Sequence, residues 1–398
     1  MTQAGLTVAV IGGGIGGLAA AALLLDAGFD VQVYEQAGAL SEIGAGIQIS
    51  PNGSRILHRL GLAGVLAQRG VRPVGVHQRR WDDGRTLQRA PLGETVERTF
   101  GAPYYHFHRA DLLAAIAAVL PGERVHVGHR LVDAIDHGSH VEARFENGAR
   151  ITADMLIGAD GIHSRVRQIL FGDDKPRFTG CVAYRGLVPA ERLAPLNLEV
   201  TSNSWWGPGG HFVHYYVAGG RLMNFVAVQE EESWTRESWN ERGAVADALR
   251  LFEGWHPQVR TIIGAVDETF KWALFDREPL PRWSAGRITL LGDSCHAMLP
   301  FMAQGAVQSI EDGATLTACL VQADGNVPGA LARYELLRKP RTTRLQEMSR
   351  HNKTRFHLPD GIDQQKRDAQ TAATGDRSIA AVGWLYAHDA GVLPGAAA

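Results

Sequence analysis

The stretch Leu6–Glu35, LTVAVIGGGIGGLAAAALLLDAGFDVQVYE, decides the fold class of this chain. A short β-branched run at 6–11 leads into a glycine cluster, an Ala/Leu-rich run follows at 18–25, and a second apolar run covers 30–34. Strand, helix and strand within about 30 residues make a βαβ unit. A membrane helix over the uncharged run 8–25 is the alternative, but it leaves the glycines of that run unexplained.

The glycine cluster inside this unit fits the pattern G-x-G-x-x-G between a strand and a helix. Gly12 makes the tight turn, Gly14 lets the backbone approach a pyrophosphate, and Gly17 lets the helix pack on the strand. Glu35 ends the second strand, where its carboxylate accepts hydrogen bonds from a ribose diol and disfavours a 2′-phosphate. The pattern predicts FAD or NAD rather than NADP, with an unliganded glycine turn as the alternative.

A second nucleotide signal lies at 286–306, GRITLLGDSCHAMLPFMAQGA. It is typical of an apolar strand, a Gly-Asp turn, a loop with Pro300 and a helix that begins at Gln304-Gly305. A carboxylate at the strand end, Asp293, suits a ribose or ribityl hydroxyl, and a helix N-terminus suits a flavin, which is anionic when reduced. The alternative is a buried strand running into a surface helix, with Asp293 as a turn residue.

A third signal is GADG at 158–161, followed by HSRVR at 163–167. A tight turn there presents Asp160 at a strand end, and Arg165 and Arg167 are in place to face phosphates. An Asp-Gly hairpin followed by a basic helix face fits the same residues, so both interpretations stay open. No second G-x-G-x-x-G occurs, so one dinucleotide is held in a Rossmann site and any nicotinamide partner must use a groove.

Composition narrows the function classes. The chain has 398 residues, 40 basic and 42 acidic, and a formal net charge of −2, so neither nucleic acid nor an anionic membrane is an expected partner. The three cysteines are far apart in sequence, which indicates a reducing compartment and argues against a dithiol reductase. With no secretory signal, a cytoplasmic location is expected, with no metal site and no membrane span; a monomer or homodimer is expected.

The pattern changes in the middle of the chain. Between about 180 and 229, short runs separated by Gly/Pro turns such as GPGG predict an antiparallel sheet, and 235–263 looks helical. We therefore predict a cofactor domain made of 1–178 and 272–350, with a substrate-binding sheet domain at 179–271 inserted into it. Residues 351–398 are predicted to form an irregular tail with a helix near 379–387.

Taken together, the motifs resemble those of single-component FAD-dependent aromatic hydroxylases. The resemblance covers roughly residues 6–350 and is closer to the subgroup of salicylate hydroxylase, 3-hydroxybenzoate 6-hydroxylase and 6-hydroxynicotinate 3-monooxygenase. It implies an α/β fold, with a Rossmann-like, glutathione-reductase-like FAD-binding domain and an inserted antiparallel-sheet substrate domain. Besides the three signals above, it rests on GAGIQISPN at 44–52, HRADL at 108–112, VAYRG at 182–186, GHFVHYY at 210–216 and PLPRWSAGRITLLGDSCHAMLPFMAQGA at 279–306.

The resemblance implies a run of residues along FAD. Glu35 and the first glycines hold the adenosine end, Arg109 lies along the cofactor, and Asp293 holds the ribityl part. The loop before the last helix passes the isoalloxazine ring, where the wider family usually has a glycine at the position of Ala303. The predicted FAD-binding set is Gly12, Gly14, Gly17, Glu35, Arg109, Asp160, Asp293, Pro300, Gly305 and Ala306.

Hydroxylation of a phenol needs a base, because a hydroxyl of pKa about 10 must lose its proton to make the ring more nucleophilic. His211 is the predicted base. On a strand of period two it shares a face with Val213 and Tyr215, and the resemblance matches His211 and Tyr215 to active-site residues of the subgroup. Cross-strand packing is the alternative for both. Gln304 is predicted to contact substrate or flavin, or else to reach its own helix backbone.

The expected function is therefore FAD-dependent hydroxylation of a small phenolic or hydroxy-heteroaromatic acid with NADH or NADPH and O2, through a flavin hydroperoxide. Gln48 stands where the hydroxynicotinate enzyme has a histidine, which favours a carbocyclic acid. Arg185, Arg221 and His77 are candidates for the substrate carboxylate. A flavin-dependent dehydrogenase or oxidase without oxygen insertion is the alternative, and a flavin-binding protein without turnover is a third class.

Overall fold

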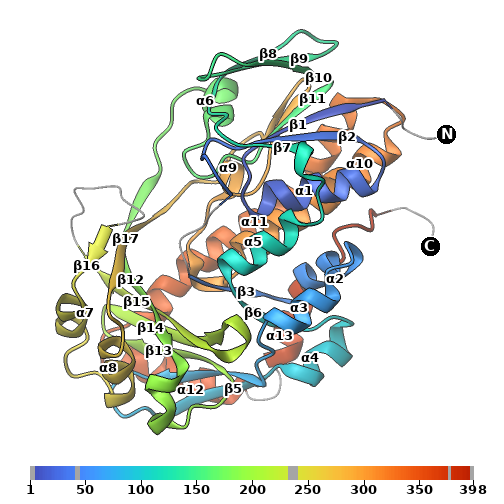
Figure 1. The fold of residues 1–398 in the computed structure, drawn as a ribbon. Coiled ribbons are helices and arrows are strands. Elements are labelled where there is room, and N and C mark those ends of the chain that lie inside the picture. The colour runs from blue at the N-terminus through green and yellow to red at the C-terminus, as the bar shows by residue number, and fades with distance from the viewer. Residues whose placement is uncertain (1–4, 41–44, 232–240, 375–377, 395–398) are drawn as a thin grey trace.

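The computed structural model describes residues 5–40, 45–231, 241–374 and 378–394. Two large sheets lie at opposite ends of the molecule, and long helices connect them (Figure 1). Gly44, in one of the segments that carry the resemblance, lies outside the described residues, as does 235–240 of the predicted helical segment. No helix of the described part of the chain is both long and apolar enough to cross a membrane.

The first sheet has six strands in the order β18-β19-β11-β1-β2-β7. All neighbours are parallel except β18 and β19. The predicted strand-helix-strand unit is confirmed as β1, α1 and β2, so this sheet is Rossmann-like. The bounds are β1 Thr7–Ile11, α1 Ile15–Asp26, β2 Asp30–Tyr34, β7 Val125–His126, β11 Met155–Gly158, β18 Ser284–Ala285 and β19 Ile288–Leu290.

The small residues of α1 explain how closely this helix packs against α10. α1 packs against α10 (Gly305–Gln322), and a Cβ added to Gly313 of α10 would lie 2.9 Å from the Cα of Ala20. Only small side chains allow two helices to come this close. The alanine-rich run at 18–25, which resembled a membrane helix in composition, is therefore a buried helix covered by a second helix.

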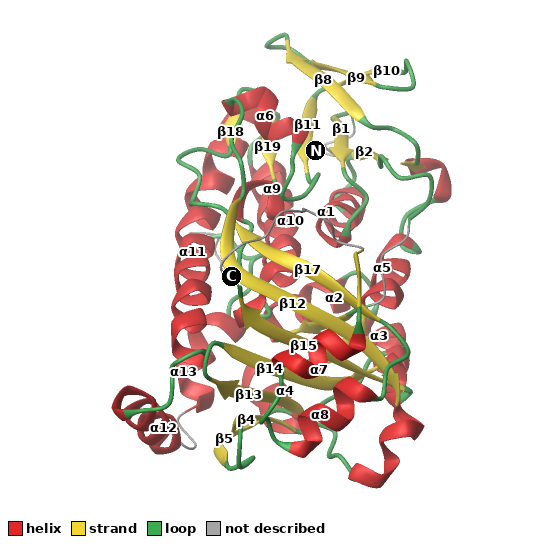
Figure 2. Ribbon diagram, turned by 90° about the vertical axis from the view of Figure 1, so that its left-hand side faces the viewer, coloured by secondary structure: helices red, strands yellow, loops and turns green. Residues whose placement is uncertain are grey.

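The second sheet has eight strands in the order β16-β17-β12-β15-β14-β13-β4-β5. Its neighbours are antiparallel except β13 and β4. α7 and α8 cover one face of it (Figure 2). The bounds are β4 Gly75–Arg80, β5 Thr86–Pro91, β12 Arg177–Pro189, β13 Ser202–Gly207, β14 Gly210–Val217, β15 Leu222–Glu230, β16 Glu241–Gly243, α7 Val245–Leu251, α8 Pro257–Gly264 and β17 Thr269–Asp276.

This sheet is larger than the segment predicted to form it. β4 and β5 come from the first segment of the chain and extend the sheet at one edge, while β17 crosses the predicted boundary at 271/272. In the described part of 235–263, one strand and two short helices replace the expected helical segment. The division into two domains stays a proposal, and any boundary must keep these strands with the sheet.

The remaining elements connect and cover the two sheets. They are β3 Gly46–Ile49, α2 Pro51–Arg59, α3 Ala63–Arg69, α4 Gly93–Phe100, β6 Tyr105–His108, α5 Arg109–Ala117, β8 Leu131–Asp136, β9 Val141–Phe145, β10 Arg150–Ala153, α6 Arg165–Phe171, α9 Asp293–His296, α11 Val327–Phe356, α12 Ile362–Thr374 and α13 Ser378–Tyr386. The expectation of an irregular tail before 379 was wrong, because α11 continues to Phe356 and α12 follows it.

A buried ion cluster joins α10 and α11 beneath the Gly-Asp turn. Arg338 of α11 is 1% exposed and bonds Glu311 and Asp312 of α10, which are both fully buried. Arg341 adds a second guanidinium to Glu311. Asp312 also accepts the Gly292 amide at 3.0 Å, so the cluster fixes the turn that presents Asp293.

The two carboxyls stay ionised despite their burial. Burial raises the pKa of Glu311, but the charges of Arg338 and Arg341 outweigh it and lower that pKa to about 2. Burial likewise raises the pKa of Asp312, and His296 and Arg338 lower it to about 2. Since both pKa values fall on folding, the stability they contribute is present above pH of about 4 and is lost as the pH falls towards 2.

Replacing Arg338 tests this cluster. Arg338→Met leaves two buried carboxylates without their main partner and should lower the free energy of unfolding at pH 7 by about 3–5 kcal/mol. The difference in the free energy of unfolding between this variant and wild type should become smaller as the pH falls to 4, because the unpaired carboxyls then bind protons. Urea unfolding at several pH values measures this. Arg344→Met, at an exposed position of the same helix, is the matched control. An equal loss of unfolding free energy in both variants would contradict the stabilising role of the ion cluster.

Candidate active site

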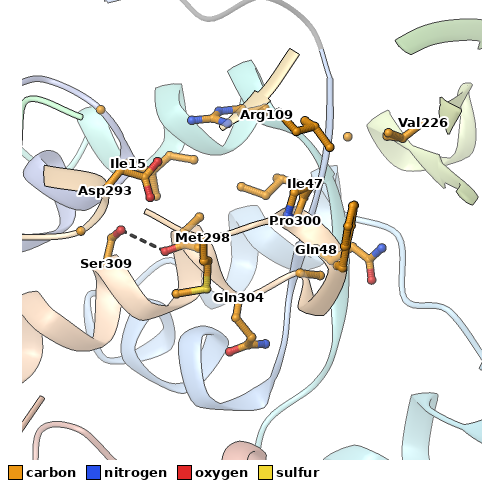
Figure 3. A pocket seen from close by; sticks show the side chains of 18 of the residues that line it. Ile15, Ile47, Gln48, Arg109, Val226, Asp293, Met298, Pro300, Gln304 and Ser309 are labelled. Carbon is orange, nitrogen blue, oxygen red and sulfur yellow. Dashed lines mark hydrogen bonds between the residues drawn. The ribbon is translucent and has the colours of Figure 1, made fainter. Parts of the chain in front are cut away.

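A cavity of about 350 Å³ lies between the parallel sheet and the uncovered face of the large sheet (Figure 3). The turn 14–16 and residues within 291–306 line it from the side of the parallel sheet, and β3 adds 46–48. Strands β12, β14, β15 and β17 line it from the large sheet. Its volume lies in the range of small-molecule sites. Segments distant in sequence therefore enclose one space between the two sheets, which is a candidate ligand site.

The three fingerprint glycines have different surroundings. A Cβ on Gly12 would lie 2.3 Å from the Ala159 carbonyl oxygen, and one on Gly17 would lie 2.0 Å from the Gly12 carbonyl oxygen. A Cβ on Gly14 would meet no heavy atom within 4 Å, and Gly14 lines the cavity. Two glycines are thus required by packing, whereas Gly14 leaves open space beside the N-terminus of α1, a position that could hold a pyrophosphate.

Glu35 stands at the end of β2, as predicted, and shapes the glycine turn. Its Oε2 accepts the Gly13 amide at 2.7 Å and its Oε1 accepts the Ala37 amide at 2.8 Å. Each carboxylate oxygen has a second lone pair, which leaves capacity for a ribose hydroxyl. Glu35 lies beyond the cavity lining, which fits an adenosine end placed away from the reacting ring.

Asp160 bonds its own chain rather than the cavity. Its carboxylate accepts the Ser164 hydroxyl at 2.5 Å and the amides of Arg165 and Val166 at 2.7 and 3.1 Å, so it caps α6. Its neighbours Ala159 and Gly161 line the cavity. The segment is therefore a strand-to-helix turn rather than a hairpin, and Asp160 shapes the turn that borders the cavity.

Neither arginine of the third signal lines the cavity. Arg167 is buried and donates to the carbonyls of Ser294 and Ile162 and to Asp174. Arg165 donates to the Val132 carbonyl on the surface. The expectation that both could face phosphates was wrong, because α6 directs one into the protein core and the other outward.

The second signal does border the cavity. Asp293 has an exposed side chain, and Arg109 lies near it across the cavity wall (Figure 3). Burial lowers the pKa of Arg109, and the charge of Asp293 raises it. Pro300, Gly305 and Ala306 line the same wall. The N-cap residue Gln304 makes no side-chain cap bond to α10, and the first turn of the helix has no acidic residue, so the positive helix end faces the cavity.

Gln304 contributes to this wall, but its amide is engaged elsewhere. Its Nε2 donates to the Ser50 hydroxyl at 3.0 Å, and its Oε1 accepts from Asn52 at 3.2 Å and from Gln308 at 3.1 Å. In Figure 3 its side chain points away from the other labelled groups. Its predicted contact with substrate or flavin therefore stays a prediction, while the bonds show that it anchors the loop. The preceding Ala303 has a φ of 51°, the region that favours glycine, which explains the family's preference there.

One face of β14 forms the opposite wall. His211, Val213 and Tyr215 all line the cavity, as the strand period predicts, together with their β15 partners Val226 and Val228. Trp205 and Phe212 lie instead in the core under α7 and α8. The structure thus brings His211 and Tyr215, the predicted base and its neighbour, to the cavity, whereas Trp205 and Phe212 serve core packing.

His211 is held by a partner that the sequence did not reveal. Its Nδ1 lies 2.7 Å from Nε2 of His357, and Nδ1 of His357 lies 2.9 Å from Oε1 of Glu230. Phe301 packs edge-on against His211 with ring centroids 4.7 Å apart. Burial, and then the charge of His357, lower the pKa of His211 well below its ordinary value, so the ring is neutral at pH 7. His357 carries no motif, and only the return of α11 to the sheet identifies it.

Tyr215 is held in the protonated form. Burial raises its pKa, while a hydrogen bond from Gln48 and the charge of Arg185 oppose this. Gln48 in turn accepts the hydroxyl of Tyr104 at 2.6 Å. The His106 ring packs on Tyr215 at 4.4 Å. Tyr215 can therefore donate a hydrogen bond into the cavity, while His211 can accept one.

Among the candidates for a substrate carboxylate, only Arg185 lines the cavity. It stacks on the Trp272 ring, and burial and the nearby Arg109 lower its pKa. Arg221 is exposed at the start of β15 and His77 is buried in β4, both away from the cavity lining. Arg185 and Arg109 thus bring two guanidinium groups to this space, with the Asp293 carboxylate near Arg109.

Comparisons with known proteins agree with this geometry. The FAD binding domain family matches residues 5–349. The chain is 44% identical over 384 residues to a 3-amino-4-hydroxybenzoate 2-monooxygenase of Streptomyces platensis, covering 96% of each chain. It is 39% identical over 349 residues to the 6-hydroxynicotinate 3-monooxygenase of Pseudomonas fluorescens, covering 87% of this chain and 90% of the other.

A solved structure extends the match to the cofactor. Klebsiella pneumoniae HpxO, complexed with FAD and uric acid, superposes with a TM-score of 0.85 at 29% identity. The match covers 94% of this chain and 95% of that one. This relative of the same fold binds FAD. We therefore expect the glycine turn and the α10 N-terminus to lie at the two ends of one FAD site, which variants can test.

Gly14 and Gly17 provide a matched pair of variants. Gly17→Ala forces a Cβ into the Gly12 carbonyl and should lower the free energy of unfolding by roughly 2 kcal/mol or more. Gly14→Ala meets open space and should change stability by less than about 0.5 kcal/mol, while weakening FAD binding by at least about ten-fold, since its Cβ occupies the pyrophosphate space. Chemical unfolding of the apoprotein and FAD titration measure the two effects. Unchanged FAD affinity in Gly14→Ala would contradict the prediction that the pyrophosphate binds beside Gly14.

Proposed function

Because this chain belongs to the FAD binding domain family and is an FAD-dependent aromatic monooxygenase, we propose that it hydroxylates a small hydroxybenzoate-type acid with NADH or NADPH and O2. One observation carries the proposal: a single cavity joins the cofactor elements to a neutral histidine, a protonated tyrosine and an arginine. These three groups match the functional groups of a phenolic acid.

The residues of the cofactor wall fit FAD. Gly14 and the α1 N-terminus would hold the pyrophosphate, and Glu35 the adenosine ribose. Asp293 and Arg109 would hold the ribityl part, with 300–306 beside the ring. Bound FAD, reduced by NADH or NADPH, supplies activated oxygen for transfer to the aromatic ring. Gln304 acts here as a positioning residue for the loop, and Asp160 as one for the turn.

The sheet wall would bind and activate the substrate. Arg185 pairs with the carboxylate, since it is the candidate cation that reaches the cavity. His211 accepts the proton of the ring hydroxyl at Nε2, which raises the electron density of the ring carbon to be hydroxylated. Tyr215 donates a hydrogen bond, because its raised pKa keeps the hydroxyl protonated. Valines 213, 226 and 228 exclude water around the ring.

The relatives indicate which acids to try first. The substrates in the two relatives' names both carry one carboxylate and one ring hydroxyl. Gln48, which bonds Tyr215, favours a carbocyclic ring, so 3-amino-4-hydroxybenzoate is the first candidate. The three buried, unpaired cysteines fit the proposed cytoplasmic location.

Product analysis tests the reaction. The purified protein should carry a flavin spectrum and, with NADH or NADPH under 18-O-labelled O2, convert 3-amino-4-hydroxybenzoate to a product one labelled oxygen heavier. The panel also includes 3-hydroxybenzoate, salicylate and 6-hydroxynicotinate. Oxidised product without label would instead identify a dehydrogenase or oxidase. Absence of flavin, or of substrate-dependent oxygen uptake with every compound, would refute the proposal.

His211→Asn isolates the role of the base. The amide of asparagine can replace the Nδ1 bond to His357 but offers no base at the Nε2 position. Hydroxylation should fall by about 10²- to 10⁴-fold, while FAD and substrate affinities change little. His214→Asn is the matched control, because His214 lies buried on the other face of β14. If both variants keep wild-type turnover, His211 is only a packing residue.

A further inference from the structure

We infer that His357 and Glu230 form, with His211, a proton relay that carries the substrate hydroxyl proton from the cavity to the protein surface. The inference rests on the proposed function and deepens it, because it assigns roles to two residues outside the cavity wall. His357 and Glu230 act through His211 and are positioning residues rather than catalytic ones.

The relay consists of two hydrogen bonds in series. Nδ1 of His211 lies 2.7 Å from Nε2 of His357, whose Nδ1 lies 2.9 Å from Oε1 of Glu230. Both distances are those of good hydrogen bonds. The side chain of His357 is 2% exposed and that of Glu230 is 44% exposed, so the chain begins at a buried base and ends in solvent.

The order of the three groups sets the ring tautomers. A carboxylate only accepts, so Glu230 requires the proton of neutral His357 to sit on Nδ1. Nε2 of His357 then has the lone pair and accepts from Nδ1–H of His211. This leaves the lone pair of His211 on Nε2, the nitrogen that a base facing the cavity must offer. The surface carboxylate thus prepares the buried base through His357.

Proton transfer along this chain balances without any further reactant. The substrate O–H bond breaks as His211 gains a proton on Nε2 and loses the one on Nδ1. His357 gains that proton on Nε2 and loses its own from Nδ1 to the Glu230 carboxylate. Glu230 then releases a proton to bulk water. Each imidazole then carries its proton on Nε2 instead of Nδ1. The starting tautomers are restored when the rings rotate, or when a proton passes back along the same chain from Glu230 to the ring oxygen.

The backbone holds the relay in place. Glu230 lies on the same face of β15 as Val228, the cross-strand partner of His211. The Gly209 amide donates to the His357 carbonyl at 3.0 Å, which ties the end of α11 to the turn before β14. Phe301 and Phe356 pack their rings against His211 and hold its ring in place.

Among the residues that the structure describes, Lys353 and Cys181 also face the relay, and neither interrupts it. Lys353 of α11 lies 3.9 Å from Glu230 and donates to the Thr179 carbonyl at 2.7 Å. The hydrogen bond from His357 and, after it, the charge of Lys353 lower the pKa of Glu230, which favours the acceptor form. Cys181 of β12 is buried, and burial raises its pKa to about 12, so it remains a neutral thiol.

Proton release on substrate binding tests the relay without turnover. FAD-loaded protein, without NADH or NADPH, is mixed in weak buffer at pH 8 with 3-amino-4-hydroxybenzoate and, separately, with 3-hydroxybenzoate. A pH indicator follows the released proton, and the flavin difference spectrum follows binding. In wild type, proton release should keep pace with binding. In His357→Gln and Glu230→Gln, release should be at least about ten-fold slower while binding remains.

Controls separate the relay from structural support. Glu231→Gln removes the neighbouring carboxylate, which pairs with Lys271, and should release protons like wild type. In His357→Ala, added imidazole should restore the release rate. Two outcomes would overturn the relay and leave the hydroxylase proposal standing. One is proton release at the wild-type rate in His357→Gln, and the other is substrate binding without proton release in wild type. Absence of the flavin change with both compounds and the rest of the substrate panel would refute the hydroxylase proposal and the relay with it.

Discussion

The buried ion cluster between α10 and α11 is the constraint on which the cofactor wall depends. Arg338 pairs with both Glu311 and Asp312 and Arg341 pairs with Glu311 inside the protein, where unpaired charges would be very costly. The same carboxylates also hydrogen-bond the segments beside the cavity. Asp312 accepts the Gly292 amide of the Gly-Asp turn, and Glu311 accepts from the Asn52 side chain, which also donates to Gln304. The Gly-Asp turn and the α10 N-terminus are therefore held by one charged network.

The large sheet supplies the second half of the site through its alternating faces. One face of β14 packs under α7 and α8, and the other presents His211, Val213 and Tyr215 to the cavity. Because successive side chains point to opposite faces, any register shift by one residue would bury the active-site groups under the helices. The apolar core on the covered face therefore fixes the orientation of the polar groups on the other.

The two walls meet through α11. This helix carries Arg338 beneath the cofactor loop and ends at Phe356, just before His357, which bonds His211 of the sheet. A single long element thus links the charge cluster to the hydrogen-bonded pair His211 and His357. That continuity gives the C-terminal part of the chain a role in positioning His211.

Local patterns in the sequence determined much of this protein. The βαβ unit, the packing roles of Gly12 and Gly17, and the shared face of β14 follow from short-range periodicity and steric demands. Tertiary structure alone decided where long side chains go: Asp160 caps α6, Arg167 turns into the core, and the Gln304 amide joins the network below the loop. It also added β4 and β5 to the sheet and brought His357 to His211, 146 positions earlier. Such partners are separated by tens to hundreds of residues, and no local period encodes which of many polar groups will meet once the chain has folded.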